Sequence, residues 1–120
     1  METKDWPDFA RGLSGEIRNL RGEAPEVMKA FSFLAQSALA QGALDGKTKE
    51  LIATGISVAI RCDDCIAFHV KAAVQHGATR EEVLETLGVA IYMGAGPAAM
   101  YASHALGAFA QFAGEKAPQP

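Results

Sequence analysis

Two cysteines and one histidine are spaced so that their side chains can act together. Residues 62–69 read CDDCIAFH, a C-x-x-C pair followed four residues later by an imidazole. If a helix begins near Cys62, side chains three and four residues apart share one face, so both thiols and His69 meet. Thiols at this spacing close a disulfide with little backbone movement, and a helix N-terminus stabilises the thiolate that attacks peroxides and disulfides. The segment predicts thiol redox chemistry.

Thiol chemistry at such a pair needs a group that accepts and donates protons, and His69 is well placed to be that group. Its imidazole can accept a thiol proton or, when protonated, favour the thiolate. Glu50, twelve residues before Cys62, can orient this imidazole if the two helices pack antiparallel; otherwise it is an ordinary acid in a first helical turn. Asp63 and Asp64 suit the helix dipole, but their negative charge disfavours a neighbouring thiolate.

Two other interpretations of the cysteines stay open, a metal site and a buried structural pair. The C-x-x-C-x-x-x-H pattern supplies three zinc ligands, and Glu50, His76 or His104 could add a fourth. Structural zinc sites, however, usually draw their ligands from two separated motif halves, so we expect no metal and no organic cofactor. His76, beside Gly77, fits a residue that binds free carbonyls at a helix end, and His104 fits a core or interface position.

Composition narrows the class of protein. The 120 residues suffice for one domain, residues 1–120. Eleven Lys and Arg against fourteen Asp and Glu give a net charge of −3 without a basic stripe, which argues against nucleic acid as a partner. The N-terminus lacks the order of a secretory signal, and no uninterrupted apolar run reaches the length of a membrane span. We therefore expect a cytoplasmic protein with no membrane partner, where a redox pair or metal site is more typical than a stapling disulfide.

Apolar residues recur with helical period along most of the chain, which predicts an all-α protein. We expect residues 1–22 to be a loosely structured N-terminal arm or a short helix, and residues 114–120 to be a disordered tail. Five helices are expected between them, over residues 25–42, 47–61, 62–77, 79–93 and 97–112, with Thr79 and Glu82 forming a capping box. The helix over 47–61 is apolar nearly all round, so we expect it to be enclosed and the chain to form a homo-oligomer.

At this point the chain resembles a known family. Glu50, Cys62, Cys65 and His69, together with the turn over residues 77–82, match the redox-active branch of the carboxymuconolactone decarboxylase and alkylhydroperoxidase-D-like family. The similar stretch runs from Lys49 to about Tyr101.

The resemblance implies a small antiparallel helical bundle of about five to six helices, assembled into hexamers or, as the second choice, trimers. It also implies a peroxidase or disulfide oxidoreductase that takes a small peroxide or disulfide as substrate and an unknown thiol as reductant. In this pattern Cys65 is the nucleophile, Cys62 the resolving thiol, His69 the base and Glu50 its partner. Helix position alone favours Cys62 as the more acidic thiol.

One position departs from the family pattern. Members that use lipoyl partners often have a histidine just before the second cysteine, where this chain has Asp64. Two alternatives to a peroxidase are a non-catalytic redox sensor or scaffold and a lactone decarboxylase. The resemblance argues against the latter, because the genuine decarboxylases do not depend on a cysteine pair.

Overall fold

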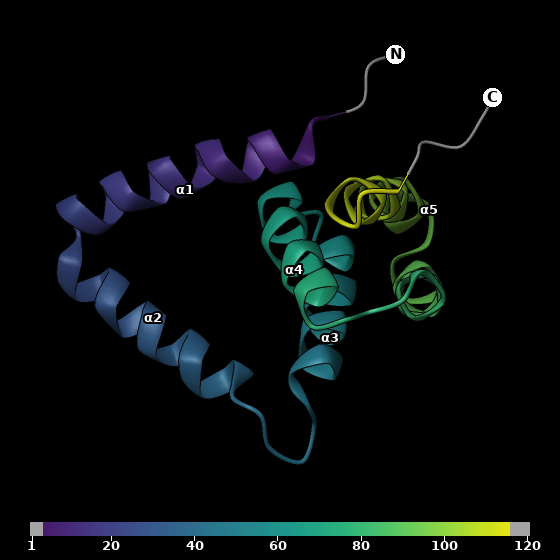
Figure 1. Cartoon of the computed structure of the whole chain (residues 1–120), viewed down its shortest axis with the longest axis horizontal. Coiled ribbons are helices and arrows are strands. Elements are labelled where there is room, and N and C mark those ends of the chain that lie inside the picture. Colours follow the sequence, from purple (N-terminus) through teal and green to yellow (C-terminus); the bar gives the residue numbers. More distant parts are fainter. Residues whose placement is uncertain (1–3, 116–120) are drawn as a thin grey trace.

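The computed structural model describes residues 4–115, and every regular element in this range is an α-helix (Figure 1). The helices are α1 (Trp6–Glu23), α2 (Pro25–Leu39), α3 (Gly46–Ala59), α4 (Asp63–Gln75) and α5 (Arg80–Phe112). The all-α prediction is confirmed. Helices α3, α4 and α5 pack against one another as the body of the molecule, whereas α1 and α2 reach away from it (Figure 1).

The helix ends follow the signals in the sequence. Proline 25 opens α2, and Asp45 caps α3 by accepting a hydrogen bond from the Thr48 amide at 2.8 Å. The capping box predicted for Thr79 and Glu82 is present, with both bonds formed at the start of α5. Gly77, just past α4, has φ +83°, the left-handed conformation that glycine adopts without a steric cost.

An ion pair joins the starts of α3 and α5. Lys47 Nζ lies 2.8 Å from Glu82 Oε2. The hydrogen bond between them lowers the pKa of Glu82 and raises the pKa of Lys47. The bond from Thr48 likewise lowers the pKa of Asp45 at the α3 cap. These charges therefore fasten the ends of two helices whose middles bury apolar residues.

Helix α5 is bent where the sequence predicts a break. Ala95 has φ 55° and ψ −137°, outside the helical region, and Pro97 follows within the same helix. Proline lacks the amide hydrogen that a continuous helix requires, and its ring crowds the carbonyl four residues back. Among residues 4–115, α5 is the one helix whose length and apolar composition would allow it to cross a membrane. It packs against α3 and α4 in this structure, and we still expect no membrane partner.

The core lies where α3, α4 and α5 meet. Its fully buried side chains include Val58 of α3, Ile66 and Val70 of α4 and Val83 of α5. The second half of α5 contributes mainly methyl groups, from Ala98, Ala102, Ala105 and Ala108. Such small residues let helices approach closely, so this half of α5 lies tight against the N-terminal part of α4 and α1.

Of the two alternatives predicted for the N-terminal residues, a loose arm or a short helix, the structure shows a helix. Residues 6–23 form an 18-residue helix, and Trp6 and Ala10 are 3% and 2% exposed. Gln111 of α5 holds this end, since its Oε1 accepts from the Trp6 amide at 2.6 Å and its Nε2 donates to the Lys4 carbonyl at 2.9 Å. The glycines at 12, 15 and 22 suggested a loose arm, but an aromatic anchor outweighs them. Residues 1–3 and, in the expected tail, 116–120 lie outside the described range.

Helix α2 and the outer face of α3 remain uncovered in the single chain. No side chain of α2 is buried, and Lys49 ties its end to α3 by donating to the carbonyls of Ala38 and Ala40 at 3.0 and 2.5 Å. The expectation that α3 is enclosed is therefore wrong for one chain, because α3 is buried only where it packs against α4 and α5. The exposed large apolar residues of these two helices are Val27, Phe31, Phe33, Leu34, Ile52 and Ile56, and Ile60, just past the end of α3, is exposed as well.

Candidate functional site

The site is built by the short corner between α3 and α4. The Cys62 amide donates to the Ser57 carbonyl at 3.0 Å, and the Arg61 amide donates to the Val58 carbonyl at 3.1 Å. Arg61 has φ +60°, a left-handed conformation that is uncommon for residues other than glycine. This corner turns the chain back on itself, so α4 runs antiparallel to α3 with its first turn beside the end of α3.

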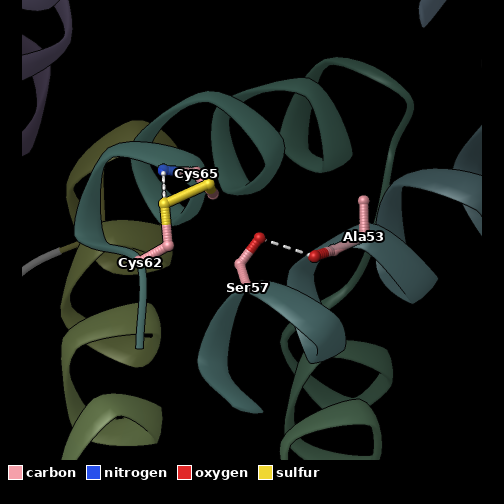
Figure 2. The surroundings of a disulfide bond; sticks show 4 residues. All are labelled: Ala53, Ser57, Cys62 and Cys65. Atoms are coloured by element: carbon pink, nitrogen blue, oxygen red, sulfur yellow. Dashed lines mark hydrogen bonds between the residues drawn. A yellow bond between two sulfur atoms is a disulfide. The ribbon is translucent and has the colours of Figure 1, made fainter. Parts of the chain in front are cut away.

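Cys62 and Cys65 form a disulfide across the first turn of α4 (Figure 2). Cys62 is the residue that caps the helix, and its Sγ accepts a hydrogen bond from the Cys65 amide at 3.1 Å. Both residues are half-buried, in a region where the helix dipole is positive. The predicted C-x-x-C redox pair is therefore present as a disulfide, and the sulfur that the helix end stabilises directly belongs to Cys62.

Ser57 of α3 lies beneath this disulfide in Figure 2. It is 2% exposed, and its hydroxyl donates to the Ala53 carbonyl at 2.6 Å. Thr54, fully buried one turn earlier, donates to the Glu50 carbonyl at 2.8 Å. Both hydroxyls therefore donate to carbonyls of their own helix.

Glu50 and His69 meet as the antiparallel packing requires. His69 Nδ1 lies 2.7 Å from Glu50 Oε1, with the carboxylate side chain 9% and the imidazole 30% exposed. An ionised carboxylate can only accept a hydrogen bond, so Nδ1 carries the hydrogen and Nε2 is left to exchange a proton. His69 stands one helical turn after Cys65, which places an oriented imidazole on the cysteine-bearing face of α4.

A second histidine–carboxylate pair lies at the same helix end, and the sequence did not reveal it. His104 Nδ1 of α5 is 2.9 Å from Asp63 Oδ1, and Lys4 Nζ is 3.3 Å from Asp63 Oδ2. The His104 side chain is 41% exposed, so it is not a core residue of the single chain, and the interface position stays a prediction. No spacing rule links residues 4, 63 and 104; only the packing of α1 and α5 on α4 brings them together. His76, by contrast, lies at the C-terminal end of α4 as predicted.

Nothing in the described part of the chain gathers the ligands that a metal would need. Within residues 4–115 no three His, Cys, Asp or Glu side chains lie close enough to hold an ion. The two sulfurs are bonded to each other, and His76 is at the opposite end of α4 from Cys62. The arrangement favours thiol–disulfide chemistry over the zinc alternative.

Fold and site together define a class: an all-helical protein with a C-x-x-C disulfide at a helix N-terminus and, one helical turn on, a part-buried carboxylate–histidine pair. The chain belongs to the carboxymuconolactone decarboxylase family, whose model matches residues 25–108. The family resemblance seen in the sequence is thus confirmed.

Solved structures share this fold. A carboxymuconolactone decarboxylase family protein from Legionella pneumophila is 50% identical, with a TM-score of 0.87 over 90% of this chain and 96% of its own. A Thermotoga maritima family protein, for which a part in the antioxidative response has been suggested, is 32% identical, with a TM-score of 0.76 over 83% and 86%. An uncharacterised protein of Cupriavidus necator is 47% identical over 85 residues, 71% of this chain and 75% of that protein.

Proposed function

We propose that this protein is a thiol-dependent peroxidase or disulfide oxidoreductase that cycles between a Cys62/Cys65 dithiol and its disulfide. The observation that carries the proposal is the disulfide at the α4 N-terminus with the Glu50–His69 pair one turn away. Family membership agrees with a redox enzyme of this kind. The chain's own residues supply the thiols and the proton carrier, so the proposal includes no organic cofactor and no metal.

In the oxidative half of the cycle, the Cys65 thiolate attacks one peroxide oxygen and the oxygen–oxygen bond breaks. The departing alkoxide takes a proton from His69, which leaves an alcohol and a sulfenic acid on Cys65. His69, now neutral, takes the proton of the Cys62 thiol, and the resulting thiolate attacks the Cys65 sulfur. The sulfur–sulfur bond forms, the sulfur–oxygen bond breaks, and the departing hydroxide takes that proton from His69 and leaves as water. Glu50 holds the imidazole in the orientation these proton transfers need.

In the reductive half, a dithiol reductant attacks the disulfide and is itself oxidised to a disulfide. Cys62 is the better leaving group in this step, because its sulfur already accepts the Cys65 amide hydrogen bond at the positive end of α4. The proposal therefore gives the sulfurs separate duties: Cys65 attacks the peroxide, as the family pattern implies, whereas Cys62 is the sulfur whose thiolate the helix stabilises.

The test is a thiol titration of the reduced protein before and after one equivalent of hydrogen peroxide, with mass spectrometry to locate the bond. Loss of two thiols with a Cys62–Cys65 disulfide supports the proposal, and Cys65→Ser is expected to abolish peroxide consumption. Two thiols that stay unreactive would refute it. A stoichiometric reaction that never turns over with added dithiol would favour the redox sensor, and full activity without either cysteine would favour acid–base chemistry of the lactone type.

We also propose that the working form is a homo-oligomer in the cytoplasm. The chain exposes apolar residues on α2, on the outer face of α3 and on the first half of α5, where a groove is lined by Ile52, Ile56, Val89 and Met93. Monomeric proteins rarely leave so much contiguous apolar surface in water, whereas a second copy would cover it. The number of copies, six or three, is a matter for measurement.

A further inference from the structure

The Lys4–Asp63–His104 cluster adjoins the disulfide but has no part in the peroxide chemistry above. Asp63 is the first residue of α4 and the direct neighbour of Cys62. Its two carboxylate oxygens each contact a basic side chain from a distant part of the chain, with His104 Nδ1 at 2.9 Å from Oδ1 and Lys4 Nζ at 3.3 Å from Oδ2. Asp64, the other acid of this turn, is exposed and has no ion pair in the described structure.

The two basic side chains of this cluster, Lys4 and His104, pack against aromatic rings. Lys4 Nζ lies 4.1 Å from the centroid of the Phe9 ring and 5.3 Å from that of Trp6. The imidazole of His104 lies 4.9 Å from the Tyr101 ring, centroid to centroid, and 6.4 Å from Trp6. The cluster therefore has a defined geometry, built from α4, α5 and the residues at the start of α1.

An uncompensated carboxylate next to Cys62 would oppose the thiolate that the helix N-terminus favours. The Lys4 ammonium offsets this charge, and His104 offsets it further when its imidazole is protonated. A more stable Cys62 thiolate stabilises the reduced protein and so raises the tendency of the disulfide to be reduced. Protonated His104 should thus make the disulfide more oxidising, and loss of that proton should make it less so.

We propose that His104, acting through Asp63, is a positioning residue that sets the redox equilibrium of the Cys62–Cys65 disulfide and makes it pH-dependent. This inference rests on the proposed function, since it concerns the same sulfurs. It gives each sulfur its own histidine–carboxylate pair: Glu50–His69 beside Cys65 for peroxide attack, and Asp63–His104 beside Cys62 for the thiolate that leaves on reduction. The titratable groups facing His104 are Asp63 from α4, Tyr101 from its own helix and, across Asp63, Lys4.

The test measures the equilibrium constant for reduction of the disulfide by glutathione, in buffers from acid to alkaline pH. At a pH where His104 is protonated and the reduced protein carries the Cys62 thiolate, His104→Gln is expected to lower this constant about threefold, the scale of a solvent-exposed ion pair. At alkaline pH, where His104 is neutral, the substitution should leave the constant unchanged. Asp63→Asn is expected to raise it. In the Asp63→Asn background the effect of H104Q should shrink, because the route through the carboxylate is gone.

Matched controls are present in the same chain. His76→Gln removes an exposed histidine at the far end of α4 and should leave the constant unchanged, and Asp64→Asn should raise it whether or not His104 is present. If H104Q perturbs folding, Lys4→Gln serves as the test variant instead, and it should lower the equilibrium constant for reduction at every pH. Shifts of the same sign in H104Q and D63N, or an H104Q effect undiminished by D63N, would overturn the inference. Failure of the proposed function would show differently, as a wild-type protein that forms no disulfide with peroxide.

Discussion

Removing the charge of Glu50 while keeping its shape tests the proton relay most directly. In Glu50→Gln the amide oxygen can still accept a hydrogen bond from His69 Nδ1, so the 2.7 Å contact and the orientation of the ring can persist. What is lost is the negative charge that stabilises the imidazolium form of His69. The substitution therefore separates the electrostatic contribution of Glu50 from its positional one.

The size of the effect follows from the burial of the pair. Glu50 is 7% exposed as a residue, so water screens its charge only weakly. Hydrogen bonds to charged groups contribute about 1.5–3 kcal/mol, and each 1.36 kcal/mol is about a tenfold change in rate. We expect E50Q to slow disulfide formation about ten- to a hundredfold, with little change in the stability of the fold.

The assay is a single-turnover reaction of the reduced protein with peroxide, quenched in acid, alkylated and read by mass spectrometry. Glu85→Gln, an exposed acid on α5, is the matched control and should react at the wild-type rate. In a double-mutant cycle, E50Q combined with His69→Asn should be no slower than H69N alone, since both act through one imidazole. If E50Q reacts within about twofold of wild type while H69N is slow, the charge of Glu50 plays no part and the reasoning fails.

Three further predictions concern the fold and its assembly. Ala95→Gly should raise the free energy of unfolding by about 1 kcal/mol, because glycine adopts the φ 55°, ψ −137° backbone without strain. Gly94→Ala should lower it, since the added Cβ would lie 2.6 Å from the methyl group of Ala98, one turn on. Equal effects of the two substitutions in urea denaturation would refute this. Glu82→Gln should lower the urea midpoint at neutral pH but not in strong acid. The pKa of Glu82 in the folded protein lies below the ordinary 4.5, so the stability that its carboxylate contributes is present above pH 4.5 and is lost as the pH falls through the folded pKa. A deficit that persists in acid would contradict that sign. Phe31→Glu with Leu34→Glu should reduce the sedimenting mass to that of a 12.6 kDa monomer, and a wild-type protein that already sediments as a monomer would refute the oligomer.

Local signals in the sequence were enough for the helices and for half of the site. The caps at Pro25 and Thr79 and the break near Pro97 depend on neighbours a few residues away, so their positions can be read without knowing the fold. The same holds for the cysteines: C-x-x-C at a helix start places two sulfurs within bonding distance whatever packs around them. The glycines left residues 6–23 undecided between a loose arm and a helix, because the anchoring of Trp6 is a contact with α5 that no local pattern contains.

The sequence alone therefore determined an all-helical chain with a redox-capable cysteine pair and a histidine on one face. The tertiary structure decided which carboxylates those groups meet. Glu50 reaches His69 only because α3 and α4 pack antiparallel, and Asp63 reaches Lys4 and His104 only because both ends of the chain pack against the start of α4. Helical periodicity fixes neighbours within one helix, whereas electrostatics at a site depends on distances through space, between residues that are 19, 41 and 59 positions apart in the chain.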